Sequence, residues 1–565
     1  MAKPRAKPQL SLDCAHVSDT AAGIPPQHWS RRFFQHIFCA FSDDQFADLY
    51  QEGGRYPISP SLLAAITLLQ FIFRVPDREA VENTIMRRDW RMALGLGPDW
   101  TGFDPTVLVR FRQRLRKHKQ THLLLKAVLA QAKDLGLLTH RRVRMDASHL
   151  LADVARLSRA DALAEALRLT ITALEAAHPE LRERPDFLRL LELYGEENWV
   201  GNGNSSEPRL RELGRDAQAL LAIGAEYPEP GPAAATLAQM VAENFLEAEP
   251  SAAEPSAAGP EPRPPEQLPP DRMLTPHDPE VKAGRKGDLR WLGDKVHVVE
   301  TAEPDRPNFI IDMVVTDPHQ DDSTLTLELL QRARFILPKL NQGLGDTGYA
   351  SASNSRQAAD MGIELITPAR PPSHRGRLPA SEFELDFAHQ TARCPEGHAC
   401  TCWSTRGKYL EIRFPRHACA ACPRRSECTS SKQGRSLHLS KDYQQLQADR
   451  ARMARPEFAE IYRLRAGIEA TISQLVHRCG LRRSRYRGSP GRELHALLAG
   501  AGLNAWRLIA CLLPAEPAAE AVTQAAPAGF SSVVQGLYRL VQASLRAAHR
   551  PRALSSPLRV SPSSR

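Results

Sequence analysis

The sequence predicts an α/β protein in which a mixed β-sheet with helices packed on it follows an all-helical region. Two observations carry this prediction. Apolar residues recur every three or four positions from residue 30 to residue 130, as in amphipathic helices. Further along, the order is strand, insertion, hairpin, helix, strand, helix, strand, insertion, helix. The 565 residues are enough for about two to four separately packed modules.

The charge balance favours a polyanionic partner but does not name one, since membranes and acidic proteins would also attract it. There are 74 lysines and arginines against 65 acidic residues, which gives a net charge of +9. The basic N-terminus lacks the apolar run of a secretory signal. An apolar stretch from Leu494 contains Asn504 and Arg507, which favours a buried helix over a membrane span. Six of ten cysteines fall between Cys394 and Cys428, so we expect a cytoplasmic protein with one local metal or redox site.

The helical region of residues 30–130 ends in a basic helix. Asp104 can cap this helix and Pro105 fits its first turn. Its sides carry Arg110, Arg112, Arg114 and Arg116. This pattern resembles a helix-turn-helix, and we expect residues 30–130 to bind DNA through Arg110, Arg112 and Arg114. A solvated basic helix on an ordinary helical bundle is the alternative.

The first strand is expected at residues 141–150, where apolar and polar residues alternate and Asp146 sits near the end. Helical periodicity returns over residues 152–248. A run rich in Pro, Ala and Glu follows, which cannot bury enough apolar surface to order itself and is typical of a linker. We therefore expect residues 152–287 to be a helical insertion plus a linker.

The remaining strands are expected within residues 288–370, which with residues 138–151 make the first part of the core. Residues 294–317 predict a hairpin around the turn "EPDRP". The stretch "GLGDTGYAS" places Asp346 at a Gly-rich strand end. A small β-rich insertion with clustered cysteines is expected at residues 371–445.

The last long core helix is expected to begin near Pro456 and to end at Gly480. Its buried stripe consists of Ile461, Leu464, Ile468, Ile472 and Leu475. Glu469 lies on the adjoining face with Tyr462, Arg465 and Ser473. Together with the apolar helix after it, this closes the core over residues 446–515 and leaves residues 516–565 as a C-terminal tail.

Carboxylates far apart in the sequence can act together on a phosphodiester if they hold metal ions. Bare carboxylates repel an anionic substrate, and bound divalent cations reverse the sign of the site. Two Mg²⁺ ions about 3.5 to 4 Å apart stabilise both the attacking and the leaving oxygen of an in-line displacement. Asp146, Asp346 and Glu469 are candidates only if the fold brings them together. A salt bridge from Glu469 to Arg465 is the purely structural alternative.

Several ordered blocks carry a resemblance to a known family. They are "TVLVRFRQRL", "VRMDASHL", "LTPHDPEVKAGRKGDLRWLGDKVHVVET", "GDTGYASASN", "CPEGHACTCW" followed by "CAACPRRSEC", and "YRLRAGIEATISQLVHRCGLRRSRYRG". From about residue 30 to residue 512 the chain resembles a bacterial insertion-sequence transposase of the DDE class, in the branch with an InsH-like N-terminal helical domain. The resemblance implies an RNase H-like mixed sheet as the catalytic core.

The resemblance also implies roles for three acids. Asp146 matches the first catalytic Asp, Asp346 the second and Glu469 the final Glu, all three as ligands of two Mg²⁺ ions, or of Mn²⁺ in their place. The implied fold puts Asp146 on the first strand, Asp346 at the fourth and Glu469 on the closing helix.

Two positions depart from the family pattern. Related transposases carry a Tyr, Arg, Glu, Lys signature on the closing helix, and Tyr462, Arg465 and Glu469 match it. Val476 stands where the Lys is expected, which puts a Lys-like phosphate contact in doubt. Asp294 replaces an expected aromatic residue and would weaken strand packing or add an acid near the site.

The cysteine cluster has the spacing of two short metal-binding knuckles. Four thiolates suit tetrahedral Zn²⁺ in a small domain with little core, and we favour Cys394, Cys419, Cys422 and Cys428 as ligands of a structural zinc. The alternative is free buried or redox-active cysteines, because Cys400 and Cys402 exceed the four positions needed and His398 and His417 compete for them.

The segment "LRRSRYRGSPGR" after Gly480 adds further positive charge behind Glu469. Arginine binds phosphate bidentately, and a tyrosine can stack on an exposed base. We expect DNA contacts from Tyr462, Arg465, Arg478, Arg482, Arg483, Arg485, Tyr486 and Arg487. A solvated charge run is the alternative.

The function that the resemblance implies is that of a DNA transposase acting on double-stranded DNA as a homodimer on paired ends, and we expect it in the bacterial cytoplasm at the nucleoid, with no membrane partner. It would bind terminal inverted repeats, cleave phosphodiesters with bound metal and transfer strands to target DNA. The alternatives are a nuclease of the same fold that does not join strands, and a catalytically silent DNA-binding protein descended from such an element.

Overall fold

The computed structural model describes residues 23–50, 58–196, 205–227, 231–246, 259–369, 371, 377–407 and 409–512. The expected C-terminal tail at 516–565 lies outside the described residues.

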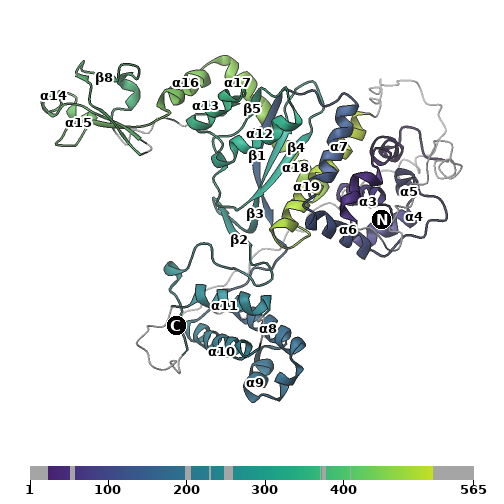
Figure 1. The fold of residues 1–565 in the computed structure, drawn as a ribbon. Helices are drawn as coiled ribbons and strands as arrows, with labels where there is room; N and C mark the ends of the chain where they lie inside the picture. The colour runs from purple at the N-terminus through teal and green to yellow at the C-terminus, as the bar shows by residue number, and fades with distance from the viewer. Residues whose placement is uncertain are drawn as a thin grey trace, which may run out of the picture. The chain divides into compact units, whose positions relative to one another are not determined.

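The fold is built on a six-stranded mixed sheet (Figure 1). Its strands are β1 (Arg142–Leu151), β2 (Lys282–Lys286), β3 (Leu289–Thr301), β4 (Ile310–Thr316), β5 (Gln342–Leu344) and β6 (Glu364–Ile366). The long strand β3 pairs antiparallel with β1 on one edge and with β2, then β4, on the other. Strands β5 and β6 continue the sheet beyond β1 in parallel. The predicted mixed α/β sheet is confirmed.

The predicted hairpin over residues 294–317 is present as the antiparallel pair β3–β4. Strand β2 was not predicted. Its sequence, "KAGRK", has no alternating apolar residues, and two of its charged side chains, Arg285 and Lys286, are exposed. The strand forms through its pairing with β3 over five positions, so the apolar pattern of the sequence did not indicate it.

The N-terminal region is helical, as predicted. Its elements are α2 (Trp29–Phe33), η1 (Phe34–Phe38), η2 (Asp43–Leu49), α3 (Pro60–Phe73), α4 (Asp77–Met86), α5 (Arg88–Leu94), α6 (Thr106–Lys117) and α7 (Leu123–Asp134). Helix α3 is buried on all sides, and the Ser59 hydroxyl accepts from the Leu62 amide at its start.

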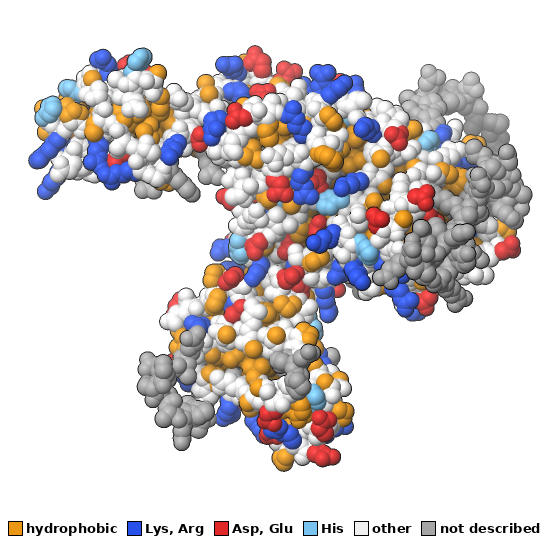
Figure 2. All heavy atoms as spheres, in the orientation of Figure 1, with side chains coloured by type: hydrophobic (Ala, Val, Ile, Leu, Met, Phe, Trp, Pro, Cys, Tyr) orange, Lys and Arg blue, Asp and Glu red, His pale blue; other side chains and the backbone are white. Residues whose placement is uncertain are grey.

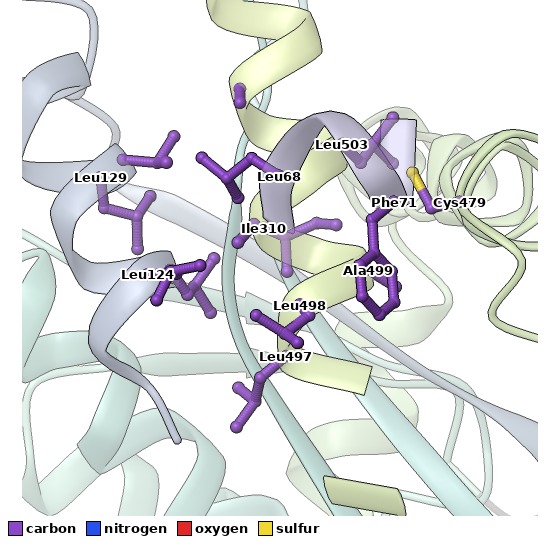
Figure 3. Packing of buried hydrophobic residues seen from close by; sticks show 14 of the residues in the cluster. Leu68, Phe71, Leu124, Leu129, Ile310, Cys479, Leu497, Leu498, Ala499 and Leu503 are labelled. Carbon is purple, nitrogen blue, oxygen red and sulfur yellow. The ribbon is translucent and has the colours of Figure 1, made fainter. Parts of the chain in front are cut away.

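Helix α19 (Ser489–Cys511) joins these helices to the sheet, because it packs against α3, α7 and β4 (Figure 3). Buried side chains from all four elements form one cluster, including Leu68, Phe71, Leu124, Leu129, Ile310, Leu497 and Leu498. The N-terminal helices therefore share one hydrophobic core with the sheet.

Helix α19 is also the one helix in the described residues that is long and apolar enough to cross a bilayer. Its most apolar 18-residue window is 78% buried inside the protein. The Asn504 side chain accepts from the Ile310 amide at 2.9 Å and donates to the Ile310 carbonyl at 2.7 Å, so it satisfies both backbone groups of that β4 residue. This agrees with the buried helix expected from Asn504 and Arg507.

The insertion after β1 is helical and has a core of its own. Its elements are α8 (Arg159–Ala177), η3 (Pro179–Glu183), α9 (Pro185–Tyr194), α10 (Glu207–Ala225) and α11 (Pro232–Asn244). Leu163, Leu167, Phe187 and Leu213 are fully buried in it.

The Pro-rich run expected to be an unordered linker is partly packed. Residues 247–258 lie outside the described residues, but from residue 259 the chain lies along the end of α11, where Phe245 bridges Pro262. Glu243 accepts from the amide of the buried Met273 at 2.7 Å. The linker prediction is wrong for this part, because Met273 and backbone bonds to α11 anchor a segment whose composition is otherwise polar.

The cysteine-bearing insertion is β-rich, as predicted, and also has a separate small core. Its elements are η7 (Ala380–Glu382), β7 (Glu384–Asp386), β8 (Thr391–Arg393), β9 (Ala399–Cys400), β10 (Trp403–Arg406), β11 (Tyr409–Arg413), α14 (Arg416–Ala420), α15 (Arg425–Cys428) and β12 (Ser436–Ser440). They form two three-stranded sheets, β7-β8-β9 and β10-β11-β12.

The last long helix has its predicted ends but is broken inside. It consists of α17 (Pro456–Tyr462), the tighter turn η8 (Arg463–Ala466) and α18 (Gly467–Cys479). Gly480 caps it in the left-handed conformation, with φ 74°. The other elements of the described residues are η5 (Pro265–Gln267), η6 (Asp322–Thr324), α12 (Thr326–Ile336), α13 (Ala352–Asp360) and α16 (Tyr443–Met453).

Candidate active site

The parallel pairing of β1 with β5 brings Asp146 and Asp346 together. The register pairs Arg142 with Gln342 and Arg144 with Leu344, so each partner is 200 positions further along the chain. Continued for two residues past β5, this offset puts Asp346 beside Asp146. Both acids lie within 4.0 Å of Arg465 Nη2, which agrees with this offset and shows that they are neighbours.

Glu469 reaches the same place from the first turn of α18, and Arg465 touches all three acids. Arg465 Nη2 lies 2.7 Å from Asp146 Oδ2 and 4.0 Å from Asp346 Oδ2, and its Nη1 lies 3.2 Å from Glu469 Oε1. The salt bridge from Glu469 to Arg465 is therefore present, but it belongs to a group of three acids. The side-chain exposures of 14%, 40% and 67% for Asp146, Asp346 and Glu469 show a site that opens to solvent on the helix side.

The tight turn η8 positions Arg465. Arg144 of β1 donates from Nη1 to the carbonyl oxygen of Leu464 at 2.8 Å, one residue before Arg465. A Cβ on Gly467 would lie 2.0 Å from that same nitrogen, so only glycine lets the Arg144 guanidinium pass. A glycine at the start of α18 thus allows the turn to be fastened to β1.

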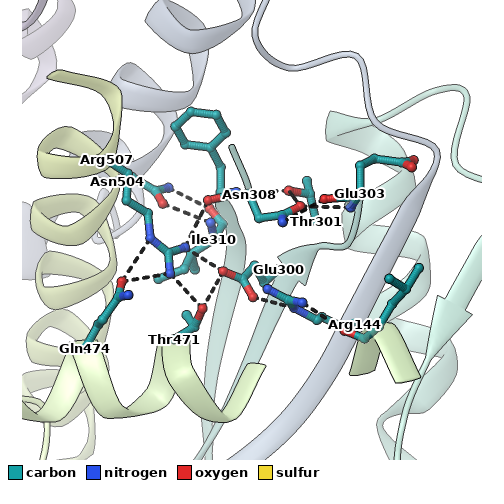
Figure 4. A network of polar contacts seen from close by, with 12 residues as sticks. Arg144, Glu300, Thr301, Glu303, Asn308, Ile310, Thr471, Gln474, Asn504 and Arg507 are labelled. Carbon is teal, nitrogen blue, oxygen red and sulfur yellow. Dashed lines mark hydrogen bonds and ion pairs between the residues drawn. The ribbon is translucent and has the colours of Figure 1, made fainter. Parts of the chain in front are cut away.

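A buried polar network fixes α18 and α19 to the sheet below the site (Figure 4). At its centre is Glu300 of β3, which is fully buried and accepts from Arg144 Nε at 2.6 Å, Thr471 Oγ1 at 2.6 Å and Arg507 Nη1 at 2.5 Å. Arg507 also donates to the Asn308 carbonyl and to Gln474. A buried carboxylate satisfied by three donors holds its neighbours rigidly, so Thr471 fixes the helix that carries Glu469.

The pKa of Asp146 is governed mainly by its burial. Burial raises the pKa of Asp146, and the Asp346 carboxylate acts in the same direction. Arg465, the Ala147 amide and Lys286 oppose this shift of the Asp146 pKa without cancelling it. Added positive charge at this position would therefore stabilise the ionised carboxylates.

A fourth carboxylate, Asp322 of η6, lies beside Asp346 and was not expected from the sequence. A Cβ on Gly348 would come within 2.9 Å of Asp346 Oδ1 and 3.0 Å of Asp322 Oδ2. Lys295 Nζ binds Asp322 Oδ1 at 2.7 Å. The run "DDS" before a helix is a common capping sequence, so it offered no signal of a site.

Beneath these acids, His297 Nδ1 and the Tyr349 hydroxyl are hydrogen-bonded at 2.8 Å. Burial lowers the pKa of His297 to about 4 and raises that of Tyr349. Both side chains are therefore neutral at pH 7 and leave the charge of the site to the acids and their basic partners.

The arginines predicted to bind DNA from α6 have different surroundings. Arg110 is exposed. Arg112 is 5% exposed, and its Nη2 binds Asp77 Oδ2 of α4 at 2.6 Å. The Arg114 guanidinium lies 4.4 Å from the ring centroid of Tyr50. Arg112 is therefore a core residue, a correction to its predicted contact with DNA, because a partly buried acid from another helix holds it.

The arginines of the segment after Gly480 also fall into two groups, those that are exposed and those with partners inside the protein. Arg483 and Arg487 are exposed. Arg482 donates to Ser148 Oγ and to the His149 carbonyl, and Arg485 donates to the Val75 carbonyl while lying over the Phe71 ring. These internal bonds give Arg482 and Arg485 structural partners in β1 and α3.

Three further predicted contact residues have internal neighbours. The Tyr486 hydroxyl is buried without a hydrogen-bond partner, and its ring lies 5.3 Å from the Arg112 guanidinium, so its predicted stacking on a base is corrected to packing in the core. Tyr462 stacks on Phe458 at 5.5 Å, and the exposed Arg478 lies over Trp506.

The two departures from the family pattern have structural explanations. Val476 packs against the main core. Asp294 is buried and, with Asp278, binds the fully buried Arg492 of α19. Asp294 therefore neither weakens β3 nor adds an acid to the site. It neutralises a core arginine.

The six clustered cysteines separate into two groups. Cys394, Cys419, Cys422 and Cys428 line one cavity of about 30 Å³ with His398. Cys400 instead donates to the Arg413 carbonyl at 2.7 Å, and Cys402 is exposed. As the side chains stand, no three His, Cys, Asp or Glu residues in the described part of the chain form a group that could hold a metal ion, either here or among the acids.

Two stretches of the chain match family models. Residues 18–114 match a transposase domain (DUF772), and residues 393–509 match a transposase DDE domain. The second match runs from the cysteine-bearing insertion into α19 and includes Glu469, whereas Asp146 and Asp346 lie outside both. No curated protein matches the chain, and neither does any solved structure. Two transposase models on separate parts of one chain confirm its resemblance to insertion-sequence transposases of the DDE class.

Proposed function

We propose that this transposase binds the terminal inverted repeats of its element, cleaves a phosphodiester at each end and joins the freed 3′ hydroxyl to target DNA. One observation carries the proposal. Asp146 and Asp346 are neighbours through the register of two parallel strands, and Glu469 meets them at Arg465. Three acids from separate elements gathered around one positive group have the composition that a phosphoryl-transfer site needs.

The acids fit divalent cations by their donor chemistry, since carboxylate oxygens suit Mg²⁺ and Mn²⁺. Asp146, Asp346 and Glu469 would hold two such ions, with Glu469 closing the group by side-chain rotation because it is 67% exposed. The ions would supply Lewis-acid stabilisation of the attacking and leaving oxygens. Arg465, whose fork of donors already faces Asp146 and Glu469, would donate to a phosphate oxygen at the same position.

We further infer that the core is RNase H-like. With β2 set aside, the strand order is β4-β3-β1-β5-β6, antiparallel on the β3 side of β1 and parallel on the β5 side. In this order Asp146 is on the first strand and Asp346 follows the fourth, as the family resemblance implies. The network around Glu300, which joins α18 to β3, supports the position of the closing helix.

The test is a Mg²⁺-dependent cleavage assay on DNA that carries the element's own ends. Asp146→Asn, Asp346→Asn and Glu469→Gln should each abolish cleavage and leave end binding intact. Glu457→Gln is the matched control, since Glu457 is an exposed acid on α17. Full cleavage by any of the three variants would remove that acid from the proposed site.

Two rivals are separated by the products. A nuclease of the same fold would release cut DNA and never join a 3′ end to a target, so a strand-transfer assay excludes or establishes it. A silent DNA-binding protein would bind the ends and leave them uncut at every Mg²⁺ concentration. Action on two ends also requires two sites, and we propose a homodimer on paired DNA in the cytoplasm, which the mass of the purified DNA complex would test.

We also propose that the insertion binds one structural Zn²⁺ through Cys394, Cys419, Cys422 and Cys428. The support is that these four thiols line the same small cavity. Burial raises the pKa of Cys428, and the three other thiols add to that shift, so a cation among them would be stabilising. Near-stoichiometric zinc in the purified protein supports the proposal, and its absence would reject it.

A further inference from the structure

A cavity of about 890 Å³ lies at the end of β1, away from the acids. Four parts of the chain line it: residues 151–156 at the end of β1, His277, the β2–β3 hairpin, and the stretch from Arg483 to Arg487. Five arginines take part in the lining, namely Arg156, Arg285, Arg290, Arg483 and Arg487.

The walls of this arginine cavity are held by backbone bonds. Leu151 donates its amide to the Arg482 carbonyl at 2.9 Å and accepts from the Ser484 amide at 2.8 Å, so the segment after α18 runs beside β1. The opposite wall is the β2–β3 pair, in which Gly284 lies directly against the Trp291 ring. The cavity is thus a formed feature of the sheet end.

The five arginines lack acidic partners. No ion pair among the described residues involves any of them, although arginines elsewhere, such as Arg112 and Arg492, are paired with acids. All five are exposed. Two are steadied by backbone oxygens, since Arg285 donates to Gly287 and Arg487 to Asp153. On the face drawn in Figure 2, basic side chains are interspersed with acidic ones.

These groups suit phosphates better than bases. Arginine is a bidentate donor for phosphate oxygens, and Asp153 is the one acid in the lining. Two aromatic side chains lie in the lining. Trp291 is 8% exposed, with Gly284 against it and His149 5.3 Å away, and His277 is held by its Nε2 at 2.8 Å from Glu165 Oε1. The cavity therefore offers positive charge without a stacking platform.

Strand β1 links the cavity to the acids. Asp146 and Leu151 are five residues apart on it, which is about 17 Å at the rise of an extended strand. This distance equals about five nucleotides at the rise of stacked DNA. Lys286, next to Arg285 in the hairpin, is close enough for its charge to act on both Asp146 and His149. Positive charge thus continues from the acids to the cavity.

We propose that the arginine cavity holds the phosphate backbone of a single DNA strand about five nucleotides from the bond that the acids cleave. This proposal rests on the proposed function, because the acids define where the bond lies. A volume of about 890 Å³ is in the range of sites for one small ligand, so a few nucleotides of one strand fit where a duplex does not. Recognition through phosphates makes the contact independent of base sequence.

The test measures DNA binding in EDTA, which separates it from cleavage. Fluorescence anisotropy is recorded for a duplex bearing the element's end, once blunt and once with an eight-nucleotide single-stranded tail. The triple variant Arg156→Gln, Arg285→Gln, Arg290→Gln should bind the tailed DNA about tenfold more weakly than wild type and the blunt DNA nearly as well. Its slope of log affinity against log salt should fall by about 2, since each phosphate contact to a single strand contributes about 0.7.

A matched control removes the same charge elsewhere: Lys133→Gln, Arg334→Gln, Lys339→Gln, all at exposed positions. Unchanged melting temperatures verify the fold of both variants. An equal loss in the control, no loss in the variant, or an equal loss on blunt and tailed DNA would overturn the strand assignment and leave the proposed function standing. Failure of the wild-type protein to bind either DNA would instead overturn the proposed function and this inference with it.

Discussion

Helix α6 and the arginine cavity are both rich in arginine, but their guanidinium groups have different neighbours. In α6, Arg112 is buried against Asp77, and Arg114 covers the Tyr50 ring. Around the cavity, Arg483 and Arg487 are exposed and form no ion pair in the described residues. The difference depends on whether another element supplies an acid or a ring. A count of arginines along the sequence therefore does not identify a DNA-binding surface.

Removal of the Arg112 side chain should have the largest effect on stability. Arg112→Leu should lower the free energy of unfolding by about 3 to 5 kcal/mol, because it leaves the Asp77 carboxylate partly buried without its partner. Urea unfolding of the full chain measures this. Arg110→Leu, at an exposed position of the same helix, should change stability by less than about 0.5 kcal/mol. Equal stability of the two variants would contradict the assignment of Arg112 to the core.

The second prediction concerns His495, whose pKa depends in part on the charge of Arg485. Burial, helped by the charge of Arg485, lowers the pKa of His495 to about 4. In the unfolded chain this histidine titrates near 6.5, so only the unfolded state gains a proton as the pH falls below 6.5. The stabilisation that depends on neutral His495 should therefore be fully present above pH 6.5, and the free energy of unfolding should fall by about 3 kcal/mol as the pH falls to 4.

The variant His495→Phe tests this directly. Melting temperatures measured from pH 7.5 to pH 4 should fall less steeply for His495→Phe than for wild type. His319→Gln, at an exposed histidine, should follow the wild-type curve. Parallel curves for His495→Phe and wild type would show that His495 does not titrate in the way its burial implies.

The outward-facing arginines should give the opposite pattern. Arg483→Gln with Arg487→Gln should weaken DNA binding about tenfold, or about 1.4 kcal/mol, and leave the free energy of unfolding within about 0.5 kcal/mol of wild type. Anisotropy and urea unfolding on the same preparations measure both. A loss of stability without a loss of affinity would make the two regions alike.

The smallest expected effect is that of Arg110, in helix α6, on DNA binding. Arg110 is exposed and remains available for one phosphate contact, so Arg110→Gln should weaken binding by less than about threefold and reduce the salt slope on duplex DNA by about 0.9. A loss of tenfold or more would restore α6 as a main recognition helix.

Much of the fold could be predicted from periodicity, and the exceptions have physical causes. The helices, the β3–β4 hairpin and the Gly480 cap follow local apolar spacing or turn chemistry. Strand β2 and the packed part of the Pro-rich run do not, because backbone pairing to β3 and α11 forms them. The shared core of α3, α7 and α19 was not predicted either. Apolar spacing shows that a helix has a buried face but does not identify the element that packs against it.

The candidate site was predictable only in part. Asp146, Asp346 and Glu469 were proposed from ordered motifs, and their proximity depends on strand register, which no single motif encodes. Asp322 was missed because it resembles a helix cap. The sequence also predicts DNA contacts for Arg112 and Tyr486, which the structure places in the core. Arg112 binds Asp77 and Tyr486 packs against Arg112, and local sequence does not reveal these partners because they come from other elements.

The place of α19 has a consequence for synthesis on the ribosome. Helices α3 and α7 pack against a segment that begins at Ser489, more than 350 residues after α7 ends. At about 5 to 20 residues per second, the nascent N-terminal helices wait roughly 20 to 70 s for that partner. Glu469 emerges in the same late interval, so the three acids around Arg465 can meet only after that segment has been made.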